Sequence, residues 1–97
     1  MTKHEAKERL WKLYWLSTLE KNGQATEEQH DELDEIIREV MSLDIRSTSV
    51  LLLRYRWRAT FSYIAEELHY STKQIRRIHD KALEKYIKQL KGDNENV

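Results

Sequence analysis

The chain has 97 residues, of which 39% are hydrophobic, with no cysteine, no proline and only two glycines. This length allows one domain with a modest core, and the lack of cysteine excludes disulfide bonds and thiolate chemistry. Lys and Arg balance Asp and Glu at 17 each, but residues 1–45 carry 6 basic against 11 acidic side chains and residues 46–91 carry 11 against 4. Because polyanion binding depends on a local basic patch, the second half is the candidate binding module.

Several function classes lack support in the sequence. No apolar run is long enough to cross a membrane and the N-terminus is polar, so we expect a cytoplasmic protein without a signal peptide. The four histidines are scattered, and neither a Gly-rich phosphate loop nor a Ser/His/Asp constellation occurs. We expect no enzyme, no metal site, no cofactor and no small-molecule substrate. His79 is expected to pack at a helix interface.

The N-terminal half predicts a hairpin of two helices over residues 3–42. Thr2 and Glu5 form a possible capping box at the start of the first helix, and Gly23 ends it. Thr26 and Gln29 offer a second box for the second helix. The acidic residues after Thr26 suit the positive end of a helix dipole and a solvated face.

We expect the first helix to be packed on two sides, because apolar side chains occupy two of its faces. One face carries Leu10, Leu13 and their neighbours, and the second helix covers it. The other face carries Trp11, Trp15 and Leu19, which either pack against the C-terminal half or contact another protein chain. Since Trp is enriched at the energetic centres of interfaces, these three residues are the predicted partner interface, for a homodimer or a larger partner.

The C-terminal half predicts a helix over Thr48–Arg56 and then a helix-turn-helix. Ile64, Ala65 and Leu68 lie at helical spacing, residues 69–71 interrupt the run, and a second apolar stripe begins at Ile75. Ser71 or Thr72 is expected to cap the last helix. On that helix one face is apolar and the opposite face is basic; the basic face carries Lys73, Gln74, Arg77, Lys81, Lys85 and Lys88. A solvated surface would also be charged, but the turn and the cap favour DNA.

The segments Leu52-Leu53-Arg54-Tyr55, Thr60-Phe61-Ser62-Tyr63-Ile64-Ala65-Glu66-Glu67-Leu68 and Ser71-Thr72-Lys73-Gln74-Ile75-Arg76-Arg77-Ile78-His79-Asp80-Lys81-Ala82-Leu83 occur in this order. Together they resemble domain four of bacterial sigma factors, and in particular the small sigma-like regulators of phages of low-GC Gram-positive bacteria. The resemblance covers about residues 46–90. It departs from the family where Arg56, Arg58 and His69 replace common glycines, so the local turns are expected to differ, although His can adopt a left-handed backbone.

The resemblance implies that the last helix enters the major groove of double-stranded DNA. Its base-reading residues would be Thr72, Lys73, Gln74 and Arg77. The chemistry fits, because Arg or Lys pairs with guanine, Gln with adenine and a Thr methyl with thymine. The predicted phosphate contacts are Arg56, Arg58, Ser71, Arg76 and Lys81.

We therefore predict an all-α single domain of about five helices. It combines an acidic helical hairpin (1–45), a basic helix-turn-helix with a long C-terminal recognition helix (46–91) and a disordered tail (92–97). The predicted function is sequence-specific DNA binding in transcription control, in a phage-type regulator on the bacterial nucleoid, with RNA polymerase or a second copy as candidate partners. The alternatives are a protein-binding module that docks on or inhibits host machinery such as RNA polymerase, and a phage DNA-packaging subunit.

Overall fold

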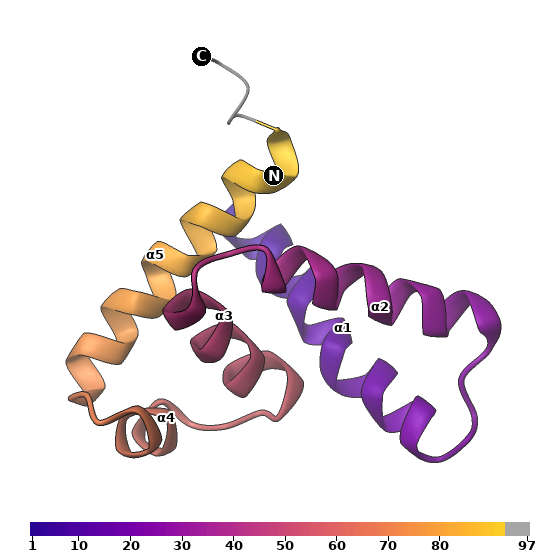
Figure 1. Cartoon of the computed structure of the whole chain (residues 1–97), viewed down its shortest axis with the longest axis horizontal. Coiled ribbons are helices and arrows are strands. Elements are labelled where there is room, and N and C mark those ends of the chain that lie inside the picture. Colours follow the sequence, from indigo (N-terminus) through magenta and orange to yellow (C-terminus); the bar gives the residue numbers. More distant parts are fainter. Residues whose placement is uncertain (93–97) are drawn as a thin grey trace.

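The computed structural model describes residues 1–92, and helices form every regular element in that range (Figure 1). In chain order these are α1 (Lys3–Lys21), α2 (Glu27–Met41), α3 (Ile45–Leu51), the π-helical turn η1 (Leu52–Arg56), α4 (Phe61–Leu68) and α5 (Thr72–Lys91). The predicted all-α class with five helices is confirmed. Of the expected tail at residues 92–97, only Gly92 belongs to the described residues.

The predicted capping boxes start both helices of the hairpin. The Glu5 N–H donates to Thr2 Oγ1 at 3.1 Å while the Thr2 N–H donates to Glu5 Oε1 at 2.8 Å. Thr26 and Gln29 repeat this pair of bonds at α2. After α1, Gly23 takes a left-handed φ of 70° that lets the chain turn toward α2. These local signals place both helices within a residue or two of the prediction.

The helix predicted over Thr48–Arg56 begins earlier than expected, at Ile45. Asp44 is the reason, because its side chain accepts from the Ser47 N–H at 3.1 Å and from Ser47 Oγ at 2.8 Å, which is N-cap geometry. The helix also changes character at its end. In η1 the Trp57 N–H donates to the Leu52 carbonyl at 3.3 Å, the five-residue spacing of a π turn.

Two groups of buried apolar side chains form the core. The larger group joins the hairpin to the C-terminal half and comprises Ala6, Leu10, Leu13, Leu16, Leu33, Ile36, Val40, Leu51, Tyr55, Ala82, Leu83 and Tyr86. The smaller group lies inside the helix-turn-helix and comprises Val50, Ile64, Ala65 and Ile75. Since α5 contributes to both groups, it is the element on which the two halves of the chain meet.

Figure 1 shows how this packing arranges the helices. The hairpin extends to one side, α5 runs along the other, and α3 lies between them with α4 beneath the start of α5. The second cover of α1 is the C-terminal half: the Trp11 ring meets the Tyr55 ring edge-on with centroids 4.6 Å apart. Trp15, by contrast, keeps 44% of its surface exposed.

Candidate nucleic-acid interface

The turn between α4 and α5 has the sharp geometry that a helix-turn-helix requires. His69 ends α4 in the left-handed conformation, with φ 61° and ψ 45°, at a position where the sequence resemblance noted a glycine. The Tyr70 N–H then donates to the Ala65 carbonyl at 2.9 Å, and Ala65 itself is buried where the two helices cross. His69 therefore takes the backbone conformation that glycine would favour.

Ser71 is the residue that caps α5. Its Oγ accepts from the Gln74 N–H at 3.1 Å, and the Ser71 N–H donates to Gln74 Oε1 at 2.9 Å. Ser71, Lys73 and Gln74 are exposed, so the positive dipole end of α5 is accessible here, which suits a phosphate oxygen. The capping box also occupies the Gln74 carbonyl oxygen. This oxygen has a second lone pair and the amide N–H groups are free to donate, so a contact with adenine has to be made by the side chain in the orientation that the capping box fixes.

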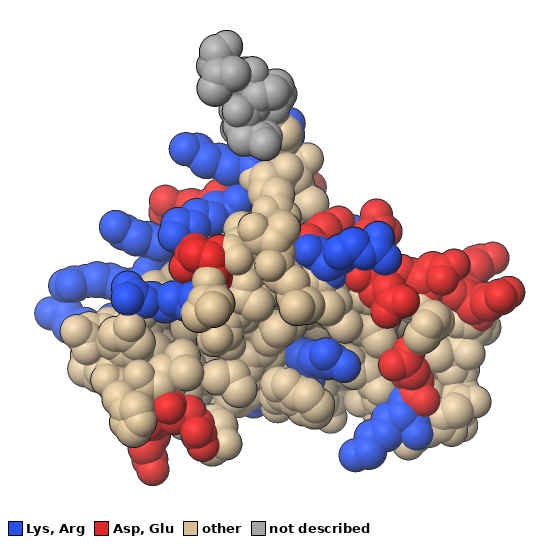
Figure 2. Space-filling model, viewed as in Figure 1, with Lys and Arg blue, Asp and Glu red and all other residues tan. Residues whose placement is uncertain are grey.

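The predicted base readers lie on the first two turns of α5. Lys73, Gln74 and Arg77 are exposed, while Thr72 is half-buried. Further along the helix, Lys81, Lys85 and Lys88 are exposed as well. In Figure 2 Lys and Arg side chains gather on the side of the molecule where α5 runs, whereas Asp and Glu gather on the opposite side, over α2. The α5 surface thus presents donors to an anionic ligand.

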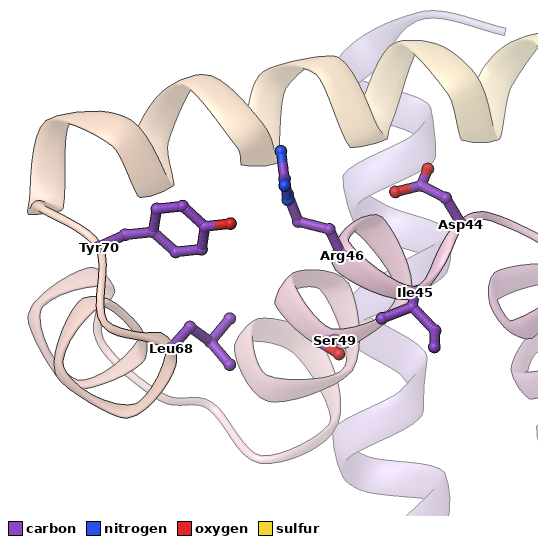
Figure 3. A pocket seen from close by; sticks show the side chains of 6 residues that line it. All are labelled: Asp44, Ile45, Arg46, Ser49, Leu68 and Tyr70. Carbon is purple, nitrogen blue, oxygen red and sulfur yellow. The ribbon is translucent and has the colours of Figure 1, made fainter.

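Arg46, which the sequence analysis did not single out, joins this surface from another element. It lies in the first turn of α3, is exposed, and places its guanidinium carbon 5.5 Å from the centroid of the Tyr70 ring (Figure 3). Arg46 and Tyr70 line a shallow hollow of about 260 Å³ together with Gln74, Arg77 and Lys81 of α5. The signal that could have found it is Asp44, since a cap there fixes Arg46 in the first turn of a helix.

Arg56 and Arg58, two predicted phosphate contacts, are directed toward the hairpin instead of lying beside the α5 surface. The guanidinium of Arg58 lies 4.9 Å from the centroid of the Tyr14 ring of α1, and that of Arg56 lies 5.3 Å from the Trp57 ring. Arg58 also has a left-handed φ of 57°, again where the resemblance noted a glycine. The structure thus separates these two arginines from the base-reading residues, and their role as phosphate contacts stays a prediction.

The remaining predicted site residues divide between surface and interior. The exposed Arg76 lies over Phe61 of α4, with 5.0 Å between its guanidinium carbon and the ring centroid. Leu19 and Trp11 are both half-buried, and Trp11 packs against Tyr55. Of the predicted partner interface, only Trp15 is well exposed.

An ion pair connects the α5 surface to the start of α3. Lys85 Nζ lies 2.9 Å from Asp44 Oδ1, so the α5 surface is joined to the start of α3. The hydrogen bond from Lys85, followed by those from Ser47, holds the pKa of the Asp44 carboxyl well below its ordinary value. Asp44 therefore stays ionised and partly offsets the positive charge of the α5 surface near Lys85.

Among residues 1–92 no group of three His, Cys, Asp or Glu side chains is placed to hold a metal ion. None of the helices in that range combines the length and apolar character needed to span a membrane.

The fold and surface define a helix-turn-helix with an exposed, basic recognition helix. Residues 40–85 match the model of the family Sigma-70, region 4. This segment is therefore a sigma region 4-like DNA-binding helix-turn-helix, as the resemblance predicted. The matched range begins near the end of α2, so α1 and most of α2 lie outside it. Neither a curated protein nor a solved structure matches the chain.

Proposed function

We propose that this protein is a phage-type transcription regulator that binds a specific double-stranded DNA sequence in the bacterial cell and acts by binding rather than catalysis. The observation that carries the proposal is the exposure of Lys73, Gln74 and Arg77 on the first two turns of α5, within a segment that matches sigma region 4. Side chains at these positions of a recognition helix reach base edges when the helix enters the major groove.

Arg46 and Lys81 would act as phosphate contacts on either side of the reading residues. Both line the hollow that contains Gln74 and Arg77. Contacts to phosphate fix the register of a protein on the duplex without reading its sequence. Ser71 complements them, because its hydroxyl proton and the first N–H groups of α5 can donate to one phosphate.

A single recognition helix reads few base pairs, so useful specificity requires a larger assembly. RNA polymerase is the proposed partner, in keeping with the family of the matched segment. A second copy of the chain is the other proposed partner, with Trp15 as the exposed residue of the predicted interface. Light scattering with purified protein at micromolar concentration, with and without RNA polymerase, distinguishes these assemblies.

The test selects a preferred duplex from a random-sequence pool and measures binding of the purified protein at several salt concentrations. We expect the logarithm of the binding constant to fall with the logarithm of salt concentration by about 0.9 per phosphate neutralised. Arg77→Ala should cost about 1–3 kcal/mol on the selected site and relax the preference at one base pair. Lys81→Ala should weaken all sequences alike and reduce the salt slope by about 1.

Lys7→Ala is the matched control, since it removes the same charge from an exposed position on α1. It should leave the preferred site bound as in the wild type. A binding constant that does not change with salt would exclude duplex DNA as the ligand. Equal losses for Arg77→Ala on every sequence would place α5 outside the major groove.

A further inference from the structure

A second surface lies where the end of η1 meets α1, away from the recognition helix. It is an open cleft of about 630 Å³, which we call the aromatic cleft, and its walls include Tyr14, Ser17 and Lys21 of α1 and Arg56 and Trp57 of the α3–α4 connection. Most of the residues that line this cleft belong to α1, which is outside the segment that matches sigma region 4. The proposed DNA contacts of α5 do not involve it.

Two aromatic side chains of the aromatic cleft are left partly uncovered by the rest of the protein. Trp57 is 64% exposed and Tyr14 is 38% exposed. Aromatic side chains that remain uncovered next to each other are typical of binding surfaces, because the free energy of covering them is still available to a ligand. An apolar or aromatic group is therefore one part of what the cleft accepts.

Positive charge is held in place beside these rings. Arg56 lies over Trp57 and Arg58 over Tyr14, with 5.3 Å and 4.9 Å between guanidinium carbon and ring centroid. Stacking fixes the planar guanidinium groups and reduces the entropy that they would lose on binding. Lys21 adds a third cation, and Glu20 is the one carboxylate among the residues that line the cleft. An anionic group is the second part of what the cleft accepts.

Two buried polar atoms at the cleft have no hydrogen-bond partner within the described protein. They are Arg56 Nε and Ser17 Oγ. A buried donor without an acceptor is costly, and each such group in a native fold calls for an explanation. A carboxylate bound in the cleft would supply one: once neighbouring side chains move aside to expose these atoms, its oxygens can accept from the Arg56 Nε–H or the Ser17 hydroxyl.

Duplex DNA fits this cleft poorly. Glu20 contacts His30, so the acidic start of α2, with Glu27 and Glu28, lies at the same end of the hairpin as the cleft. The phosphates of a docked duplex would meet these carboxylates, whereas a single acidic side chain can enter without approaching them. Contacts with phosphate groups would also leave the apolar surface of the Trp57 and Tyr14 rings uncovered.

A second copy of the chain fits poorly for a different reason. Its α4 exposes Tyr63 close to Glu67, but these two side chains already bond to each other. Its acidic helix α2 carries the exposed Glu28, Asp31 and Glu35 without an exposed apolar side chain beside them to cover Trp57. The exposed Met41 stands at the opposite end of that helix. The ligand of the aromatic cleft must therefore carry an apolar group and a carboxylate close together.

We propose that the aromatic cleft is a docking site for a partner protein, in which it binds an acidic segment that carries an aromatic or aliphatic side chain next to a Glu or Asp. The apolar side chain covers Trp57 and Tyr14, and the carboxylate pairs with Arg56, Arg58 and Ser17. This site lets the regulator hold a protein while α5 remains free for DNA.

The experiment titrates the ¹⁵N-labelled full chain with a capped peptide that contains Glu-Leu-Asp-Phe-Glu, and in parallel with its neutral counterpart Gln-Leu-Asn-Phe-Gln. We expect saturable binding of the acidic peptide, with shifts of the Trp57 indole N–H and the Arg56 Nε–H resonances. The neutral peptide should bind about tenfold more weakly, because charge-assisted hydrogen bonds are lost. Trp57→Ala and Arg56→Gln should each weaken the acidic peptide by about the same factor.

Tyr63→Ala is the matched control, since it removes an exposed aromatic side chain of α4 that does not line the cleft. It should leave peptide binding unchanged, and Trp57→Ala should leave DNA binding unchanged. If circular dichroism shows that a variant has lost helix, that variant is not used, and the resonance shifts of the wild-type protein test the proposal. Equal binding of both peptides, no saturation, or the same shifts produced by single- or double-stranded DNA would overturn the proposal.

Discussion

His79 is a titratable side chain in the interior of the fold, at the junction of η1 and α5. It is 4% exposed, stacks on Tyr55 with ring centroids 5.6 Å apart, and meets the edge of Phe61. Its Nε2 lies 2.7 Å from the Tyr55 hydroxyl and its Nδ1 lies 3.3 Å from Asp80 Oδ1. A neutral ring that accepts from Tyr55 and donates to Asp80 satisfies both contacts.

Folding stability should decrease as the pH falls below about 6.5, the ordinary pKa of His. Burial lowers the pKa of His79, with smaller contributions from Lys7 and Arg54, against the opposing effect of Asp80. The unfolded chain thus binds a proton more readily than the folded one, so the stabilisation is complete above the unfolded pKa and is lost as pH falls through the folded value. Urea unfolding between about pH 5 and 8 measures this.

His79→Gln is the informative variant, because an amide can still pair with Tyr55 but cannot titrate in this range. Its unfolding free energy should change less between these pH values than that of the wild type. His30→Gln should be present in both proteins that are compared, with and without His79→Gln. The contact with Glu20 raises the pKa of His30, which gives folding stability the opposite pH dependence. Identical pH dependence of the two chains would show that His79 is not responsible.

At the scale of the element, α3 depends on a single residue at its start. Asp44 caps the helix through Ser47 and pairs with Lys85 of α5. Asp44→Ala removes both interactions and should destabilise the protein by about 1–2 kcal/mol, mainly through the lost cap. Asp44→Asn keeps an acceptor for the Ser47 N–H and loses the exposed ion pair and the second bond from Ser47, so its cost should be smaller, about 0.5–1 kcal/mol.

Urea unfolding of both variants, alone and combined with Lys85→Ala, measures the two contributions in a double-mutant cycle. If Asp44→Asn were as destabilising as Asp44→Ala, the ion pair and not the cap would hold the start of α3.

The same element explains how much of the structure the sequence could predict. The helices capped by Thr2, Thr26 and Ser71 were predicted closely because N-cap residues are local signals. The start of α3 was missed because Ile45 is exposed and contributes nothing to an apolar stripe. The π turn in η1 has no local signature in the sequence.

The candidate site follows the same division. Lys73, Gln74 and Arg77 were predicted to be on the exposed face of the last helix, and they are. Arg46 was missed because its place beside Tyr70 depends on the crossing of α3 and α5. The orientation of Arg56 and Arg58 toward α1 depends on the docking of η1 against the hairpin. Positions on one helix are periodic and predictable, whereas contacts between elements are decided by tertiary packing.

At the scale of the whole molecule, Glu39 joins both helices of the hairpin to α5. Its carboxylate accepts from Arg9 through two bonds, at 3.0 and 2.8 Å, and from the Tyr86 hydroxyl at 2.7 Å. The pKa of the Tyr86 hydroxyl lies above its ordinary value, first because of burial and then because of Glu39. This network lies beside the larger core group, at the boundary between the two halves.

Glu39→Ala should destabilise the protein by about 2–3 kcal/mol, because it leaves the Arg9 guanidinium and the Tyr86 hydroxyl without their acceptor. Glu32→Ala is the control, since its ion pair with Lys12 is more exposed and should contribute less than about 1 kcal/mol. Urea unfolding followed by both circular dichroism and tryptophan fluorescence measures both values. Coincident transitions are expected for one cooperative unit; separate transitions would mean that the hairpin and the helix-turn-helix fold independently.

The separation of acidic and basic side chains shown in Figure 2 makes the molecule an electric dipole with no formal net charge. Such a body gains little attraction toward a polyanion at distances beyond about 10 Å in 0.1 M salt. Within that distance it experiences a torque, which turns α5 toward the polyanion and the acidic hairpin away from it. Encounters in the wrong orientation are repelled before contact, so the hairpin contributes to the geometry of approach without touching the nucleic acid.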